Sequence, residues 1–104
     1  MPTIFKNCTL SIFYEDRPAD LEIACIVALS DRELELKYDQ EDGIFWSWKG
    51  DSKGDGHFVL FANQQRHLGR ATLHRLPGSM YLEGYWLEGS YKGMWRVKLG
   101  TEFN

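Results

Sequence analysis

The sequence predicts an all-β fold: a single eight-stranded antiparallel up-and-down meander that closes into a small barrel. Prolines, glycines and short polar clusters interrupt the chain at seven places, and the expected strands between them, about 6 to 12 residues long, are rich in β-branched and aromatic residues. Within these runs apolar and polar residues alternate, as in strands with one buried face. Eight such strands leave two exposed edges unless the first pairs with the last, so closure into a barrel is favoured over a sandwich.

Length and composition fit one domain that spans residues 1–104. Hydrophobic residues make up 43% of the chain and aromatic residues 14%, which favours a folded core. The net charge of -3, with both signs interspersed, argues against nucleic acid as a partner. No apolar run is long enough to span a membrane, and the first ten residues lack the apolar core of a secretion signal, so a cytoplasmic location is expected.

The first expected strand, 3–14, ends at the polar cluster Glu15–Asp20. The second, 21–29, follows this cluster, but it has apolar residues at helical spacing, so a helix over residues 18–30 is the alternative. Each of these two strands contains one cysteine, Cys8 and Cys25, in an apolar run. Both are expected to be small buried hydrophobic side chains in a reducing compartment.

The third and fourth strands are expected at 32–38 and 44–49. A two-residue turn at Ser30-Asp31 leads into the third strand, and the cluster DQEDG at residues 39–43 separates it from the fourth. These turns imply ladders whose pairs share one face: Val27 with Leu34, Cys25 with Leu36, Ile23 with Tyr38, Tyr38 with Ile44, Leu36 with Trp46, and Leu34 with Trp48.

The fifth and sixth strands, 57–62 and 69–76, are bounded by KGDSKGDG and by NQQRHLG. Pro77-Gly78 leads to the seventh strand, 79–88, and predicts that Leu73 pairs with Leu82 and Ala71 with Gly84. Because Pro-Gly is a less natural two-residue hairpin turn than Gly-Ser, this register is less firmly specified than that of the last hairpin.

The eighth strand, 91–99, follows Gly89-Ser90, whose glycine-first form suits a type II′ turn. This turn places each tryptophan of the hairpin across from a glycine: Trp86 faces Gly93, and Trp95 faces Gly84. We interpret the glycines as making room for the indole rings, which in turn cover the bare backbone. On the other face, the same register pairs Leu87 with Lys92, Tyr85 with Met94, Glu83 with Arg96 and Tyr81 with Lys98.

A small closed meander with tryptophans on its inner face resembles the avidin and lipocalin-like (calycin-type) barrels. The resemblance covers the strand pattern and no residue motif: IFYEDRP stands near the N-terminus, where lipocalins have a GxW sequence. It implies that the interior holds one small ligand, whose identity does not carry over.

Connections of an up-and-down barrel alternate between its two ends, so the clusters at 15–20, 39–43 and 63–69 share one end with Gly89-Ser90. Aromatic walls with a few polar tips are typical of small-molecule pockets, and the inward residues here have this character. The candidate ligand-binding residues are Tyr14, Tyr38, Trp46, Arg66, Trp86, Glu88, Tyr91 and Trp95. The alternative is that rim tyrosines simply bury their rings and leave their hydroxyls in water. A ligand with a flat apolar body and one donor or cationic head at Glu88 would suit this end.

The sequence contains no recognisable catalytic, cofactor or metal motif. His57, His67 and His74 lack metal-ligand spacing, and His74 is expected to point outward beside Tyr81. Three classes of function stay open: a binding barrel, which is favoured, a structural or protein-interaction module, and an enzyme without a known motif. The second class would be a homo-dimer that uses apolar residues at outward positions, namely Ala24, Ile26, Ala28, Phe45, Tyr85 and Met94.

Overall fold

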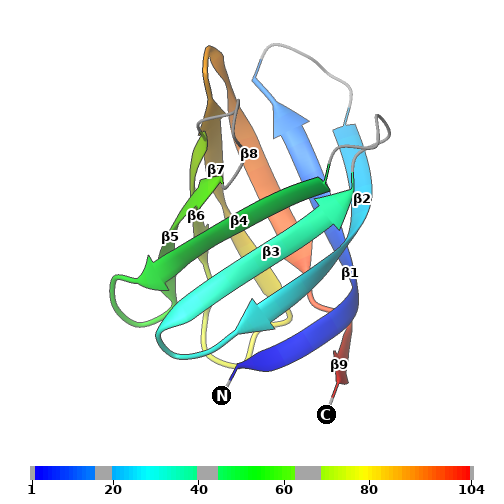
Figure 1. Ribbon diagram of the computed structural model, residues 1–104, viewed down its shortest axis with the longest axis vertical. Coiled ribbons are helices and arrows are strands. Elements are labelled where there is room, and N and C mark those ends of the chain that lie inside the picture. The colour runs from blue at the N-terminus through cyan, green and yellow to red at the C-terminus, as the bar shows by residue number, and fades with distance from the viewer. Residues whose placement is uncertain (1, 16–19, 40–44, 63–68, 104) are drawn as a thin grey trace.

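The computed structural model describes residues 2–15, 20–39, 45–62 and 69–103, and every regular element in these ranges is a β-strand (Figure 1). The segment for which a helix was the alternative forms a strand. The strands are β1 (Thr3–Tyr14), β2 (Asp20–Leu29), β3 (Glu33–Asp39), β4 (Phe45–Ser52), β5 (His57–Ala62), β6 (Gly69–His74), β7 (Tyr81–Glu88), β8 (Tyr91–Lys98) and β9 (Thr101–Phe103).

The eight-stranded barrel predicted from the sequence is confirmed. Each strand from β1 to β7 pairs antiparallel with the next, and β8 pairs with β1, which closes the sheet. The short strand β9 was not predicted; it pairs with Ile4, Phe5 and Lys6 at the start of β1. Between Phe5 and Cys8 the register of β1 shifts, and Asn7 there has a φ of 59°. This bulge bends β1. The part of β1 before the bulge pairs with β9, and the part after it pairs with β8.

The barrel interior is filled by apolar side chains, because alternate residues of all eight strands point inward. They form one continuous cluster of buried residues, to which every strand of the barrel contributes. Trp46, Trp48, Trp86 and Trp95 all belong to this cluster. The two cysteines are also buried in it, as predicted, and both are free thiols.

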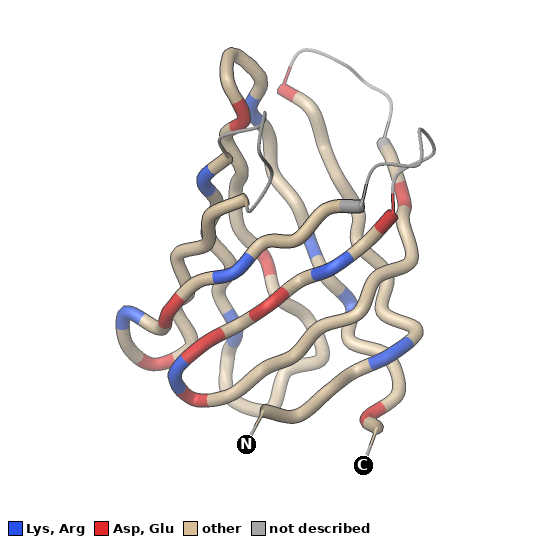
Figure 2. The backbone as a smooth tube through the Cα atoms, in the orientation of Figure 1, with Lys and Arg blue, Asp and Glu red and all other residues tan. Residues whose placement is uncertain are grey.

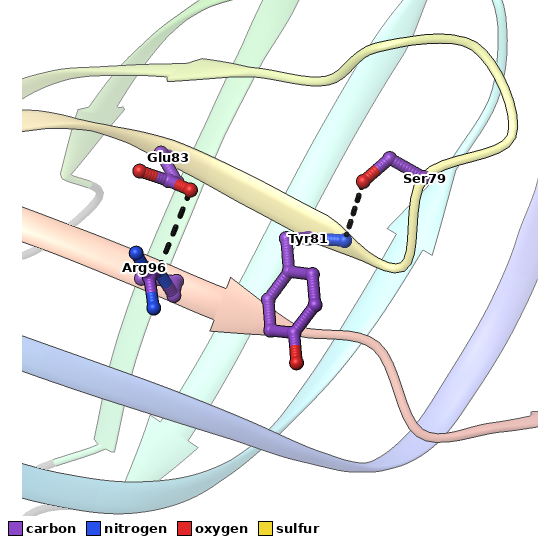
Figure 3. Close-up of polar contacts among 4 residues, drawn as sticks. All are labelled: Ser79, Tyr81, Glu83 and Arg96. Carbon is purple, nitrogen blue, oxygen red and sulfur yellow. Dashed lines mark hydrogen bonds and ion pairs between the residues drawn. The ribbon is translucent and has the colours of Figure 1, made fainter.

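The last hairpin has the predicted register. Trp86 lies opposite Gly93, Gly84 opposite Trp95 and Glu88 opposite Tyr91. Gly89 has a φ of 60°, and Ser90 is not among the residues with positive φ, as a type II′ turn requires. On the outer face of this hairpin Glu83 forms an ion pair of 3.4 Å with Arg96, as Figure 3 shows.

Three other predicted registers are wrong by two residues. Val27 pairs with Leu36 instead of Leu34, Tyr38 with Trp46 instead of Ile44, and Ala71 with Trp86 instead of Gly84. His74 therefore lies opposite Glu83 and not beside Tyr81. The inward residues are nevertheless the predicted ones, because a shift of two preserves the face of every side chain.

Turn chemistry explains the shifts at two of these hairpins. Ser30 closes the β2–β3 turn with its side chain, since its Oγ accepts hydrogen bonds from the backbone N–H groups of Arg32 and Glu33. In the β6–β7 connection, Arg75 Nε donates to the Ser79 carbonyl oxygen at 2.7 Å, and Gly78 has a φ of 75°. Pro77-Gly78 thus lies inside a longer connection with the Pro-Gly geometry of a type II turn, not at the tip of a two-residue hairpin.

Charged residues of both signs are distributed along the outer faces of the strands and over the turns (Figure 2). No helix in the described ranges is long and apolar enough to cross a membrane. Several large apolar side chains also lie on the outside, including Phe13, Phe61, Leu87 and Met94.

Candidate functional site

Four of the predicted site residues lie at strand ends on one end of the barrel, which we call the upper end because it lies uppermost in Figure 1. Tyr14 ends β1, Tyr38 stands one residue before the end of β3, Glu88 ends β7 and Tyr91 begins β8. Tyr38 is buried, Tyr14 and Glu88 are half-buried, and Tyr91 is 53% exposed. Tyr91 therefore borders solvent, although it is the ladder partner of Glu88.

The rings below this rim form two groups. Tyr38, Trp46 and Trp48 are stacked in sequence, with centroid distances of 6.5 and 6.0 Å, and Trp48 meets Trp95 edge to face at 5.1 Å. Trp48 Nε1 also donates a hydrogen bond of 3.1 Å to the Tyr38 hydroxyl. This first group runs from the rim into the core.

The second ring group is Tyr14 with Trp86, whose centroids lie 5.3 Å apart in an edge-to-face arrangement. Trp86 comes from β7 and Tyr14 from β1, and Gly93 of β8 separates their strands. A β-carbon at Gly93 would meet the Phe13 carbonyl oxygen, with Trp86 Cζ2 at 3.1 Å. The glycine therefore allows the indole to lie across β8 and reach the tyrosine.

Trp95 lies deeper than the other predicted site residues. It is 2% exposed, and its Nε1 donates to the Thr72 carbonyl oxygen at 2.9 Å. Because Thr72 belongs to β6, the indole crosses over Gly84 of β7 to reach it, which is the arrangement expected for the tryptophan and glycine pair. Trp95 supports the ring group from below and does not border the rim. Arg66 lies outside the described residues.

The electrostatics of the upper end link Glu88 to the tyrosines. Burial raises the pKa of the Tyr38 hydroxyl above its usual range, and the negative charge of Glu88 raises it further. The hydrogen bond from Trp48 lowers the pKa of Tyr38, but by less than the other causes raise it. Tyr38 therefore stays a neutral hydroxyl, able to donate one hydrogen bond and accept others.

Depressions border both barrel ends in the described part of the chain. One of about 350 Å³ lies at the upper end beside Phe61, Gly69 and Leu87. At the upper end, a shallow groove of about 330 Å³ has both Tyr14 and Trp86 in its lining, together with the outward Phe13, Tyr85 and Met94. At the opposite end, a wider depression of about 930 Å³ lies among the turns and includes Arg32, Phe58 and Arg75 in its lining. The larger depression contains none of the predicted site residues and no tryptophan.

Two residue pairs emerge only from the three-dimensional structure. Cys8 lies directly opposite Cys25 across β1 and β2, and His57 lies directly opposite His74 across β5 and β6. The sequence signal for the histidine pair is that His57 and His74 lie at equal distances from the β5–β6 connection. Within the described ranges, no group of three or more histidine, cysteine, aspartate or glutamate side chains is placed to hold a metal ion.

The fold and the ring-lined upper end define the class of this protein as a small closed up-and-down β-barrel with a buried aromatic cluster. Comparison with known proteins adds no relationship: no family model matches the chain, and no curated protein is significantly similar to it.

Proposed function

We propose that this protein is a binding barrel for a small molecule with a flat apolar body and one donor or cationic head. The observation that carries this proposal is the half-buried Glu88 carboxylate at the same barrel end as the buried Tyr38, whose ring stacks on Trp46. Rings of this kind bind flat apolar groups, and a carboxylate among them favours a positive or hydrogen-bond-donating group. The architecture agrees with that of avidin and lipocalin-like barrels, which hold one ligand.

The interior itself is packed with side chains, so the ligand would bind at the rim and not in a central cavity. Its body would lie against Tyr14 and Trp86, in the groove of about 330 Å³. Its head would extend past the lining of this groove toward Glu88, which follows Trp86 by two residues at the end of β7. A volume of this size is at the lower limit of small-molecule pockets, which begin at about 300 Å³. The ligand is therefore expected to be small.

Intrinsic tryptophan fluorescence tests the proposal, because Trp86 belongs to the groove. Wild-type protein is titrated with a library of small aromatic and amphipathic compounds that includes amines and their uncharged analogues. We expect cationic aromatic members to change the emission of the wild type. The substitution Glu88→Gln should weaken them by about 5- to 30-fold, which corresponds to about 1 to 2 kcal/mol of charge-assisted interaction.

The matched control is Glu83→Gln, the same change on the same strand. Glu83 lies on the outer face, where its carboxylate faces Arg96 at 3.4 Å. This variant should bind like the wild type. If no compound perturbs the wild type, or if both variants lose the same affinity, the rim is not a ligand site and the rings serve only the core.

A second function, protein association, is favoured by the apolar residues on the outer wall. Phe13 pairs with Met94, which in turn pairs with Tyr85, and these exposed side chains form a row across β1, β8 and β7. Apolar rows on a barrel exterior mark subunit interfaces when they are large enough. Of the outward residues predicted for a dimer surface, Tyr85 and Met94 belong to this row. Ala24, Ile26 and Ala28 lie on β2, where Ile26 is 45% exposed.

A further inference from the structure

The outer wall of the barrel contains a pair of histidines that face each other across two neighbouring strands. His57 is the first residue of β5 and His74 the last residue of β6, and the antiparallel register places them directly opposite one another. Both side chains are exposed. They are the two histidines of the described segments, and they lie far from the ring-lined upper end, beside the turns of the opposite end.

The two imidazole rings point their Nδ1 atoms toward each other. Their Nδ1 atoms lie 2.6 Å apart, and the rings meet at an interplanar angle of 69° with centroids 4.8 Å apart. At this distance one Nδ1 donates a proton and the other accepts it, so a lone pair and an N–H group converge between the rings. Replacing the shared proton by a metal ion would leave two nitrogen ligands around one centre.

The geometry needs only a small adjustment to accept such an ion. Two nitrogens at about 2.05 Å from a tetrahedral zinc ion lie about 3.3 Å apart, so the Nδ1 atoms must separate by about 0.7 Å. Exposed side chains at strand ends can make this change by rotation about χ1 and χ2. The strands themselves are already held in register by the β5–β6 ladder.

The surroundings keep the imidazoles available. Both rings are exposed, so a metal ion can approach them from solvent. Glu83 is opposite His74 on β7, but its carboxylate faces Arg96 on β8 (Figure 3). Glu83 is therefore not a third ligand in this arrangement, in accord with the absence of any three-residue cluster in the described ranges.

We propose that His57 and His74 form a two-histidine chelate for a late first-row transition-metal cation, with Zn²⁺, Ni²⁺ and Cu²⁺ as the ions that imidazole ligands suit. Water would fill the other coordination positions. Hard cations such as Mg²⁺ prefer oxygen ligands and are excluded by the ligand type. The site is separate from the rim at Glu88, and its occupancy does not depend on a ligand there.

Isothermal titration calorimetry with Zn²⁺ and with Ni²⁺, on full-length protein without a polyhistidine tag, tests the proposal. The wild type should bind one ion per chain, and Mg²⁺ should give no heat. His57→Gln and His74→Gln should each weaken binding on the order of 10²-fold, because a chelate loses its advantage when either ligand is removed. The matched control is His67→Gln, the third histidine of the chain, which should keep the wild-type affinity.

Nuclear magnetic resonance provides a second measurement that does not depend on binding heat. On addition of Zn²⁺, the imidazole resonances of His57 and His74 should shift together, and those of His67 should stay in place. The thermal melting of each variant verifies that it is folded before titration. The proposal is overturned if the wild type binds neither ion, if binding survives in both His57→Gln and His74→Gln, or if His67→Gln weakens it equally.

Discussion

Gly84 and Gly93 stand where a side chain would collide with the main chain of the next strand. A β-carbon at Gly84 would meet the Thr72 carbonyl oxygen, and one at Gly93 would meet the Phe13 carbonyl oxygen. The tryptophan opposite each glycine uses this closeness: the Trp95 indole bonds to Thr72 across Gly84. Glycine is therefore needed at both positions to avoid a clash with the backbone, and not only to make space for a ring. Backbone atoms move less readily than side chains.

We therefore expect Gly84→Val and Gly93→Val each to lower the free energy of unfolding by about 1 to 3 kcal/mol or more through overpacking. Chemical denaturation monitored by circular dichroism measures the change. Met94→Val, on the exposed outer face of the same hairpin, is the control and should change stability by less than about 0.5 kcal/mol. Wild-type stability in both glycine variants would contradict the register of this hairpin.

The His74 imidazole is expected to titrate below the ordinary histidine pKa of about 6.5, because burial and the nearby His57 disfavour its charged form. The unfolded chain then takes up a proton at a higher pH than folded His74 does. This residue's contribution to stability is therefore complete above pH 6.5 and is lost as the pH falls toward the lower folded pKa.

A pH titration of the imidazole resonances, in metal-free buffer, measures this shift. In His57→Gln the pKa of His74 should rise toward its ordinary value but not reach it, since burial is the larger cause. A His74 pKa at or above 6.5 in the wild type would contradict both causes of the shift, burial and the neighbouring His57.

For the strands, alternation of apolar and polar residues was enough to predict which side chains face inward. The accuracy of each predicted register depended on how well the turn could be identified. The β7–β8 ladder was predicted correctly, because Gly89-Ser90 fits one two-residue turn. The β2–β3 ladder was wrong by two residues, because the Ser30 side chain closes a longer turn that alternation does not reveal. Since a shift of two preserves the face, Tyr38, Trp46 and Trp86 still point into the barrel.

The pairing of Cys8 on β1 with Cys25 on β2 could not be predicted, because the β1–β2 connection gives no register. Cys8 faces Cys25 across the ladder, and Cys8 Sγ accepts a hydrogen bond from the Gly100 N–H at 3.4 Å. The thiol of Cys25, acting as donor to Cys8, lowers the pKa of Cys8 and raises that of Cys25. Directly opposed residues in an antiparallel pair are within the Cα separation that a disulfide spans.

We expect refolding in the presence of oxidised glutathione to join Cys8 and Cys25 within one chain, with two thiol hydrogens lost to the reduction of the glutathione disulfide. Mass spectrometry under non-reducing conditions would detect the loss of about 2 Da, and the cross-link should raise stability by about 3 kcal/mol. The single variants Cys8→Ser and Cys25→Ser are the controls and cannot form it. Oxidation that yields only mixed disulfides or linked dimers would contradict the facing arrangement.

At the scale of the whole molecule, closure of the barrel followed from the argument about exposed edges, and the structure realises it through the β1–β8 ladder. The strand β9 could not be foreseen, because three residues after a glycine give no periodic signal. The candidate site was predicted as a set of inward residues at one end. Their depths could not be predicted, because they depend on packing among rings: Tyr91 borders solvent, whereas Trp95 is in the core.

The outer wall supports one further prediction at this scale. If the stripe of Ala24, Ile26 and Ala28 on β2 is a dimer surface, Ile26→Glu should convert the protein from a dimer to a monomer, because a buried unpaired charge is costly. Sedimentation velocity over a range of concentrations measures this. Met94→Glu, on the row across β1, β8 and β7, tests the other apolar surface in the same way. If the wild type is a monomer, neither of these two apolar surfaces is a dimer interface.

We propose above that the upper end of the barrel binds a flat molecule with a positive head at Glu88. The most direct test of this proposal is two-dimensional NMR of the tryptophan indole N–H groups during titration with 9-aminoacridine, a flat aromatic cation, and with anthracene-2-carboxylate as a flat anion of similar size. We expect the cation to shift the Trp86 resonance more than that of the deeply buried Trp95. Glu88→Gln should reduce this effect, and the anion should have none. Unchanged indole resonances in the wild type, or equal responses to cation and anion, would contradict the proposal.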